Sequence, residues 1–255
     1  MIFETHAHYD DERFEEDRDA LITSMPGRGV GTIINVGASI ESTKTTLALS
    51  EKYPFVYAAV GVHPSDISGL NEETFAWLKE QTKKEKVAAV GEIGLDYYWE
   101  KEERARARQQ VVFARQMELA RELKLPVIVH DRDAHADCME ITRRYPDVIG
   151  VYHCYAGHIE MARELLERGY YLSFTGVITF KNAKKAIEVI REVPIERLMV
   201  ETDSPYMAPE PFRGRRNSSL YVYRMAEKIA EIKGMPVEDV ERITTENGRR
   251  LFGIV

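Results

Sequence analysis

Short apolar runs alternate with charged amphipathic segments along the whole chain, and this alternation constrains the fold more than any other feature. The runs recur about every 20 to 35 residues, the spacing at which buried parallel strands recur in βα units. Eight such units are typical of a (β/α)8 barrel. The predicted strands are Ile2–His8, Gly31–Val36, Val56–Val62, Val87–Ile93, Pro126–His130, Val148–His153, Tyr170–Phe174 and Arg197–Glu201.

The segments between these runs have the periodicity of amphipathic helices. Asn71–Lys84, in which Phe75 and Leu78 share one face, and Glu102–Leu123 are two examples, and a last helical region is expected over Ser218–Phe252. The length of 255 residues is typical of one α/β barrel. We therefore predict a single domain over residues 1–255, a TIM-type barrel that is either regular or distorted. An open doubly wound sheet is the alternative, because strand number does not determine closure.

Composition narrows the class of protein further. Hydrophobic residues make up 44% and charged residues 30% of the chain, which is typical of a globular protein. The net charge of −7 argues against a broad basic face that coats duplex nucleic acid, but it leaves room for an enzyme that binds a few phosphates. No apolar run is long enough to span a bilayer and the amino terminus is acidic, so we expect a cytoplasmic protein with no membrane partner and no obligate protein partner. Two cysteines fit a reducing compartment.

Six of the eight predicted strands end in a potential metal ligand, at the place where α/β barrels carry their catalytic residues. His6 and His8 stand at i and i+2 on the first strand, so their imidazoles point to the same face. Glu201 and Asp203 form a second, acidic pair with the same spacing. The other strand ends carry His63, Glu92, His130 and His153.

Each residue taken singly has an ordinary structural explanation, such as a hydrogen-bonded core histidine or a carboxylate held by backbone amides. Together they would crowd several ionisable groups into one barrel mouth of low dielectric, and a bound cation would relieve their repulsion. We therefore predict two divalent ions per chain, Zn²⁺, Mn²⁺ or Mg²⁺. Cys154 points away from its neighbour on the strand and is not expected to be a ligand. The expected ligands are His6, His8 and Asp203 for one ion and His130 and His153 for the other, with Glu92 bridging both.

The chain also resembles a known family, the TatD family of metal-dependent deoxyribonucleases in the amidohydrolase-like barrel superfamily, along nearly its whole length. The resemblance rests on the stretches Thr5–His8, Asn35–Gly37, Gly61–Pro64, Gly91–Tyr98, Leu125–His130, His153–Cys154, Ser173–Gly176, Thr179–Asn182, Glu201–Tyr206 and Asn247–Phe252. It implies a barrel, metal-dependent cleavage of DNA and the same six metal ligands: His6, His8, Glu92, His130, His153 and Asp203. The chain departs from the family pattern at Glu4, at Tyr155–Ala156 and at Asn217–Ser219, and none of these departures removes an expected ligand.

The predicted substrate is DNA, with phosphodiester bonds hydrolysed by metal-bound hydroxide, by preference exonucleolytically at single-stranded or frayed ends. Asp203 is expected to orient the water and accept its proton. His63 and Glu201 are candidates for substrate or a further metal ion. Tyr97, Tyr98 and Trp99 are candidates for stacking on bases, or else pack under the barrel rim. In the loop after the last strand, Arg213, Arg215 and Arg216 are candidates for phosphate contacts, against the simpler reading of a solvated basic loop.

Two other functions fit the same residues. One is hydrolysis of a C–N, ester or other phosphoester bond at the same site. Barrel relatives of that kind often carry a carbamylated lysine on the fourth strand, where this chain has Glu92. The other is a non-catalytic metal-binding protein, which is disfavoured because the whole ligand set is present.

Overall fold

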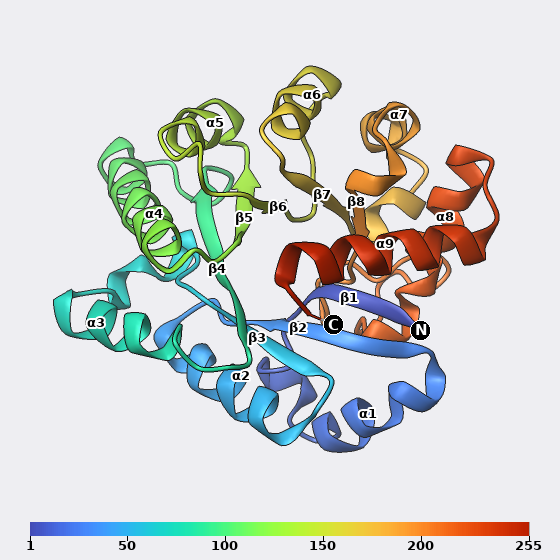
Figure 1. Cartoon of the computed structure of the whole chain (residues 1–255), viewed down its shortest axis with the longest axis horizontal. Helices are drawn as coiled ribbons and strands as arrows, with labels where there is room; N and C mark the ends of the chain where they lie inside the picture. The colour runs from blue at the N-terminus through green and yellow to red at the C-terminus, as the bar shows by residue number, and fades with distance from the viewer. Residues whose placement is uncertain (255) are drawn as a thin grey trace.

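Each of the eight apolar runs forms a strand, and the strands pair in parallel in the order in which they follow one another along the chain. The computed structural model describes residues 1–254. The predicted (β/α)8 barrel is thereby confirmed (Figure 1). The strands are β1 (Ile2–Ala7), β2 (Val30–Val36), β3 (Val56–Val60), β4 (Val87–Asp96), β5 (Val127–Arg132), β6 (Gly150–Tyr152), β7 (Tyr171–Phe174) and β8 (Leu198–Val200).

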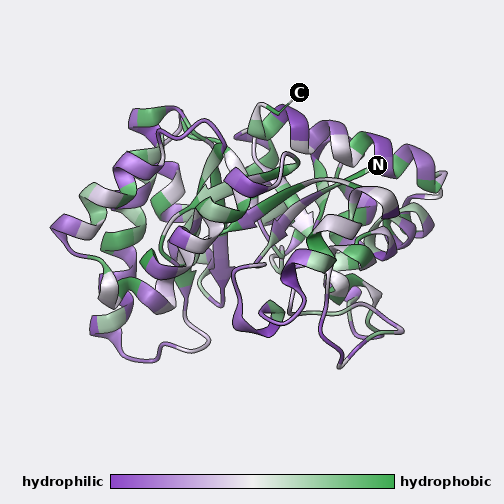
Figure 2. Cartoon of the chain, turned by 90° about the horizontal axis from the view of Figure 1, so that it is seen from below, coloured by the Kyte–Doolittle hydropathy of each residue, from purple (hydrophilic) through white to green (hydrophobic). Residues whose placement is uncertain are grey.

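Helices lie between successive strands and surround the sheet, as Figure 1 shows. They alternate between hydrophilic and hydrophobic stretches along their length in Figure 2, as helices with one buried and one exposed face do. The last helical region is divided in two, because Gly234 ends the first helix in a left-handed conformation and Pro236 precedes the second. The α-helices are α1 (Arg18–Ser24), α2 (Ile40–Lys52), α3 (Glu72–Gln81), α4 (Glu103–Leu123), α5 (His135–Arg143), α6 (Ile159–Glu167), α7 (Lys184–Glu192), α8 (Tyr223–Lys233) and α9 (Val237–Phe252).

The barrel is nearly closed where β1 meets the segment that follows β8. The amide of His8 donates to the carbonyl of Ser204 at 2.8 Å, and the amide of Asp203 donates to the carbonyl of His6 at 3.0 Å. Buried Glu4 adds a side-chain link, because it accepts hydrogen bonds from the amide and the hydroxyl of Thr202. An open doubly wound sheet is excluded, since its first and last strands would not meet in this way.

One end of the barrel is filled by an apolar cluster to which every strand contributes at least one buried side chain. The carboxyl-terminal end of α9 packs against this cluster through Leu251 and Phe252, so this end is closed. The polar side chains at the carboxyl ends of the strands therefore lie at the opposite end of the barrel. The buried strand residues in the cluster are Phe3, Ile34, Val36, Ala59, Ala88, Ala89, Ile128, Val151, Tyr171 and Met199.

Six of the eight strands end at other residues than the sequence predicts, and three of these differences affect the site. β6 and β8 stop before His153 and Glu201, and the backbone then turns at Cys154 and Asp203, whose φ angles are +43° and +54°. β4 instead continues three residues beyond Ile93 to Asp96. It can do so because Gly94 pairs with His130 on β5, where any Cβ atom at position 94 would collide with the carbonyl oxygen of His130.

Within the described part of the chain, none of the helices combines the length and apolar character that are needed to cross a bilayer.

Candidate metal centre

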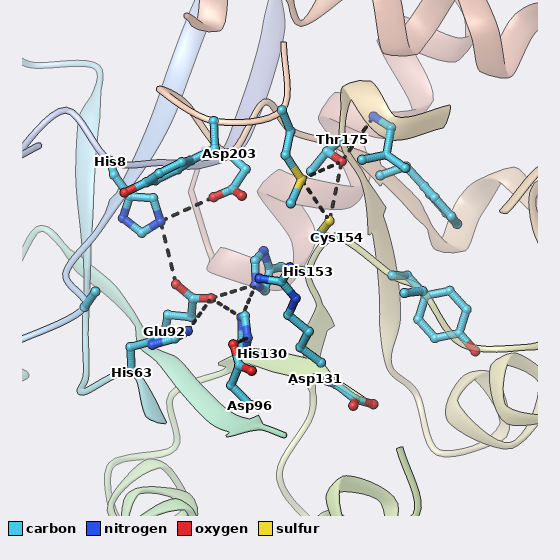
Figure 3. Close-up of a pocket in the computed structure, with 18 of the residues that line it drawn as sticks. His8, His63, Glu92, Asp96, His130, Asp131, His153, Cys154, Thr175 and Asp203 are labelled. Carbon is cyan, nitrogen blue, oxygen red and sulfur yellow. Dashed lines mark hydrogen bonds and ion pairs between the residues drawn. The ribbon is translucent and has the colours of Figure 1, made fainter. Parts of the chain in front are cut away.

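A cavity of about 740 Å³ opens at the carboxyl ends of the strands. Its floor is formed by imidazoles and carboxylates that point toward one another, as Figure 3 shows. The side chains at this floor come from strands far apart in the sequence, and parallel strands bring them together because all their carboxyl ends lie at one end of the barrel. The predicted ligands that line the cavity are His8, Glu92, His130, His153 and Asp203, and buried His6 lies directly beside them.

The carboxylate of Glu92 lies between two groups of imidazoles. Its Oε2 atom is 3.6 Å from Nε2 of His6 and 3.6 Å from Nε2 of His8. The two imidazole nitrogens are 3.0 Å apart, and Asp203 Oδ1 lies 3.6 Å from the first and 3.4 Å from the second. The four donor atoms therefore surround one small volume.

The other oxygen of Glu92 faces the second group. Oε1 lies 2.7 Å from Nδ1 of His130 and 2.7 Å from Nε2 of His153, and these two nitrogens are 3.1 Å apart. His63 reaches the same oxygen from the cavity wall, with Nε2 at 4.0 Å. The sequence prediction paired the histidines in the same way and placed Glu92 between them.

The spacing and chemistry of these donors fit divalent cations. Ligand atoms about 2.1 Å from one ion are separated from each other by roughly 3.0 to 3.4 Å, close to the separations around Glu92 Oε2. Imidazole nitrogens mixed with carboxylate oxygens suit Zn²⁺ or Mn²⁺. The structure thus places two groups of donors on either side of one carboxylate, an arrangement that could hold divalent cations.

Electrostatics in the cluster also favour positive charge. Burial alone would lower the pKa of His8, but the hydrogen bond and charge of Asp203 raise it to about 10. Burial would raise the pKa of Glu92, yet His153 and His63 hold it well below its usual value. Without a cation, His8 and His153 therefore retain protons, whereas burial lowers the pKa of His6, and a divalent cation would displace these protons.

Outer contacts orient the imidazoles. His8 donates from Nδ1 to the carbonyl oxygen of Val36 at 2.8 Å, which leaves Nε2 free to act as a ligand. The ring of His6 stacks on that of His153, with centroids 4.1 Å apart. Asp96 Oδ2 lies 3.3 Å from Nε2 of His130. Two of the imidazoles are therefore oriented by groups outside the cluster: His8 by the carbonyl oxygen of Val36, and His130 by Asp96.

Asp96 is the site residue that the sequence analysis missed. The predicted strand stopped at Ile93, so Asp96 was assigned to the loop. The period of two along a strand was the available signal, because Glu92, Gly94 and Asp96 share one face of β4.

Glu201 lies behind the cluster instead of in the cavity. It is fully buried, accepts a hydrogen bond from the amide of Cys154 at 2.6 Å and lies 3.4 Å from Nδ1 of His153. This placement suits a residue that orients His153 better than one that contacts substrate. Three buried atoms nearby, Nδ1 of His6, Nδ1 of His153 and Oε2 of Glu201, have no hydrogen-bond partner, and their residues form a group that could hold a cation, so the further metal ion predicted at Glu201 stays a prediction.

The arginines predicted to contact substrate are not at the cavity. Among the described residues, neither Arg213 nor Arg215 lines it: both are exposed, and Arg213 packs over the ring of Phe180. Arg216 forms an ion pair with Asp17. The cationic side chains that do line the cavity are Arg132 and Lys185, which the sequence analysis did not select.

The aromatic residues after Glu92 have different environments. Tyr97 is buried under the rim, where its hydroxyl donates to Asp137 at 2.6 Å. Trp99 lines the cavity and is exposed. Tyr97 therefore packs under the rim, whereas Trp99 is exposed at the cavity, and stacking on bases stays a prediction.

The chain matches the sequence model of a known family along nearly its whole length. The sequence model of the family described as TatD related DNase matches residues 3–253. This chain belongs to the TatD family. Its sequence is 44% identical to the uncharacterized metal-dependent hydrolase YabD of Bacillus subtilis, with all of both chains aligned. It is 32% identical to the 3'-5' ssDNA/RNA exonuclease TatD of Cronobacter sakazakii, over 98% of this chain and 97% of that protein.

A solved structure agrees with this assignment. The TatD homologue YjjV of Escherichia coli superposes with a TM-score of 0.92 at 30% identity, covering 100% of this chain and 98% of that one. The resemblance to the TatD family in the sequence is confirmed, and the chain is a TatD-family metal-dependent hydrolase.

The departures from the TatD pattern lie outside the six-residue cluster. Glu4 holds Thr202, as described above. The Tyr155 hydroxyl donates to the carbonyl oxygen of His158, and the Asn217 amide group donates to the carbonyl oxygens of Thr202 and Tyr206. These side chains therefore support the loops around the cavity in this TatD protein.

Replacing Glu201 by glutamine should weaken metal binding by about 10- to 100-fold, the usual effect of losing a carboxylate behind a ligating histidine. The amide oxygen can still accept the hydrogen bond from Cys154, but the negative charge near His153 Nδ1 is lost. Isothermal titration of the metal-free protein with Mn²⁺ measures the change. Glu188→Gln, on the exposed face of α7, is the matched control and should bind like the wild type. Equal affinities for the two variants would contradict a positioning role for Glu201.

Proposed function

We propose that this chain hydrolyses phosphodiester bonds in single-stranded nucleic acid, DNA above all, and acts on strand ends. The observation that carries this proposal is the position of Glu92, whose two oxygens each face a separate group of imidazoles. Paired ions that share a carboxylate are typical of enzymes that cleave phosphate esters.

We assign six residues to metal binding in this reaction. Divalent cations bound there would act as Lewis acids on the phosphate and make water acidic enough to attack near neutral pH. In the first group, the negative charge is carried by Asp203 and Glu92, which stay ionised at neutral pH because the pKa of each is held below its usual value. The assigned ligands are His6, His8 and Asp203 on one side, His130 and His153 on the other, and Glu92 between them.

Asp203 is the proposed general base. Burial would raise its pKa, but hydrogen bonding to His8 and the charge of His6 hold that pKa below its usual value. Its side chain lines the cavity, so a water molecule beside the cluster can donate a hydrogen bond to it. The carboxylate would orient this water for attack on phosphorus and take up its proton.

The choice of substrate rests on the relative from Cronobacter sakazakii and on the cavity. That relative is named as an exonuclease on single-stranded DNA and RNA. The cavity, about 740 Å³, is large enough for a nucleotide but is set within the barrel mouth, which favours a flexible single strand over a duplex. His63 and Lys185 line its wall and are available to contact the strand.

A substrate panel tests this proposal. Metal-loaded protein should cleave a labelled single-stranded oligonucleotide with a kcat/KM at least about 10²-fold above its values for simple carboxylic esters and amides. Product lengths should shorten one nucleotide at a time from one end. Equal or greater activity on the esters or amides would favour the other hydrolase class, and an even distribution of internal cuts would contradict action on strand ends.

A further inference from the structure

Two aromatic side chains are exposed beside the metal centre, and the guanidinium group of an arginine lies over their rings. Tyr98 and Trp99 have 44% and 69% of their surface exposed, large fractions for side chains of this size. The guanidinium carbon of Arg132 lies 4.1 Å from the centre of the Tyr98 ring and 5.7 Å from that of Trp99. We call these three residues the rim platform.

The rim platform is fixed relative to the metal centre by one carboxylate. Asp96 Oδ1 accepts hydrogen bonds from the amides of Tyr98 and Trp99, both at 3.0 Å. Its other oxygen, Oδ2, lies 3.3 Å from Nε2 of His130. Arg132 follows His130 by two residues on β5. The aromatic half of the platform is therefore linked to His130, a proposed metal ligand, through Asp96, and Arg132 is linked to it through β5.

The charge of Arg132 is available for a ligand. In residues 1–254 no carboxylate forms an ion pair with its guanidinium group, although several arginines on the helices have such a partner. The cavity that it lines otherwise carries many carboxylates, including Asp10, Asp66 and Asp131. An anion approaching the metal centre from this side therefore meets Arg132 at the rim.

Trp99 also separates two hollows. It lines the main cavity and a second hollow of about 310 Å³, in which Arg108 supplies another cation. A chain that leaves the metal centre across Trp99 thus passes from one hollow into the other. Repeated phosphates and flat bases are the features that this arrangement of cations and rings would recognise.

We propose that the rim platform binds a single-stranded polynucleotide, with a base adjacent to the cleaved bond stacked on Trp99 and a phosphate held by Arg132. This inference rests on the proposed function and deepens it, because it assigns the position of the uncleaved strand. It makes the enzyme prefer substrates that extend beyond the nucleotide at the metal centre.

Binding is tested first, with the metal-loaded protein and an oligothymidylate whose phosphorothioate linkages resist cleavage. Trp99→Ala should bind it about tenfold more weakly by fluorescence anisotropy, the usual loss for one stacking ring. Trp99→Phe keeps a ring and should stay within about threefold of the wild type. The platform would be overturned if Trp99→Ala bound the oligothymidylate as tightly as the wild type, or if Trp99→Phe bound it as weakly as Trp99→Ala. Tighter binding of a duplex of the same length would also overturn it.

Two further variants separate stacking from charge. The chain has two tryptophans, so Trp77→Phe leaves Trp99 as the sole tryptophan, and its fluorescence should be quenched by the oligothymidylate. Arg132→Ala should reduce the slope of log affinity against log salt concentration by about 0.7, the value for one phosphate contact on a single strand. An unquenched Trp99 or an unchanged salt slope would contradict the corresponding contact.

Cleavage separates this inference from the proposed function. Trp99→Ala should raise KM for a long unmodified strand about tenfold and have a smaller effect on bis(4-nitrophenyl) phosphate, which has no neighbouring base. Val111→Ala, an exposed aliphatic residue on α4, is the matched control and should change neither. If Trp99→Ala cleaved the long strand with the same KM as the wild type, the platform alone would be overturned. A wild type that binds through Trp99 but cleaves no nucleic acid would overturn the proposed function alone.

Discussion

Asp203→Asn should lower kcat for phosphodiester hydrolysis by on the order of 10³-fold or more. Asparagine is nearly isosteric but cannot accept a proton and carries no charge to offset the imidazoles at 3.4 Å and 3.6 Å from Asp203 Oδ1. The variant loses the proposed base and a proposed ligand together, which is why the expected effect is large. Steady-state cleavage of a labelled single strand by metal-loaded protein measures it.

Two other variants make this result interpretable. His130→Ala removes a proposed ligand of the other group and should also abolish metal-dependent cleavage, although it leaves Asp203 in place. Asp66→Asn removes a carboxylate that lines the cavity but is not among the assigned ligands, and it should keep activity within about threefold. Far-UV circular dichroism should show all three variants folded. Full activity in folded Asp203→Asn or His130→Ala would refute the assigned roles.

Removing divalent cations with a chelator should abolish hydrolysis, and adding Mn²⁺ or Mg²⁺ should restore it. The expected loss is at least about 10³-fold, because no residue of the cluster replaces the Lewis acidity that lowers the pKa of bound water to about 7. This outcome also separates an enzyme from a metal-binding protein without activity. Activity that survives complete metal removal, verified by elemental analysis, would contradict the proposed mechanism.

Thermal stability gives a second measure of the same metal binding. A cation present at about 100 times its dissociation constant stabilises the folded state by about 2.7 kcal/mol. For a protein of this size that corresponds to an increase in Tm of roughly 5 to 10 °C. Binding should also release protons, because His8 and His153 hold raised pKa values without a cation. Cation addition that changes neither Tm nor the pH of an unbuffered sample would place the metal elsewhere.

The first strand was the most predictable part of the site. Alternation along a strand places His6 and His8 on one face from their spacing alone, and the structure has both nitrogens facing Glu92. Glu92, His130 and His153 were predicted because each stands at the end of an apolar run. Local pattern was sufficient here, since all strand ends of a parallel barrel converge.

The arginine loop shows where local pattern was insufficient. Arg213, Arg215 and Arg216 lie in the loop after β8. Arg216, however, forms an ion pair with Asp17, the residue directly before α1. A loop without regular structure has no periodicity from which the direction of a side chain can be read. Arg132 and Trp99 were placed at the cavity by β5 and by the turn around Asp96, and that turn depends on a strand three residues longer than predicted.

The sequence by itself determined the eight strands, their alternation with helices and the residue types at the strand ends, because the periodicity of each segment is a local property of the chain; closure of the sheet into a barrel was decided by the tertiary structure. Only the tertiary structure decided that the two oxygens of Glu92 face different imidazole groups, that Glu201 lies behind His153, and that Asp96 connects His130 to Trp99. These relations are distances between residues on different strands, and such distances follow from barrel closure and side-chain packing. No pattern within a single strand encodes them.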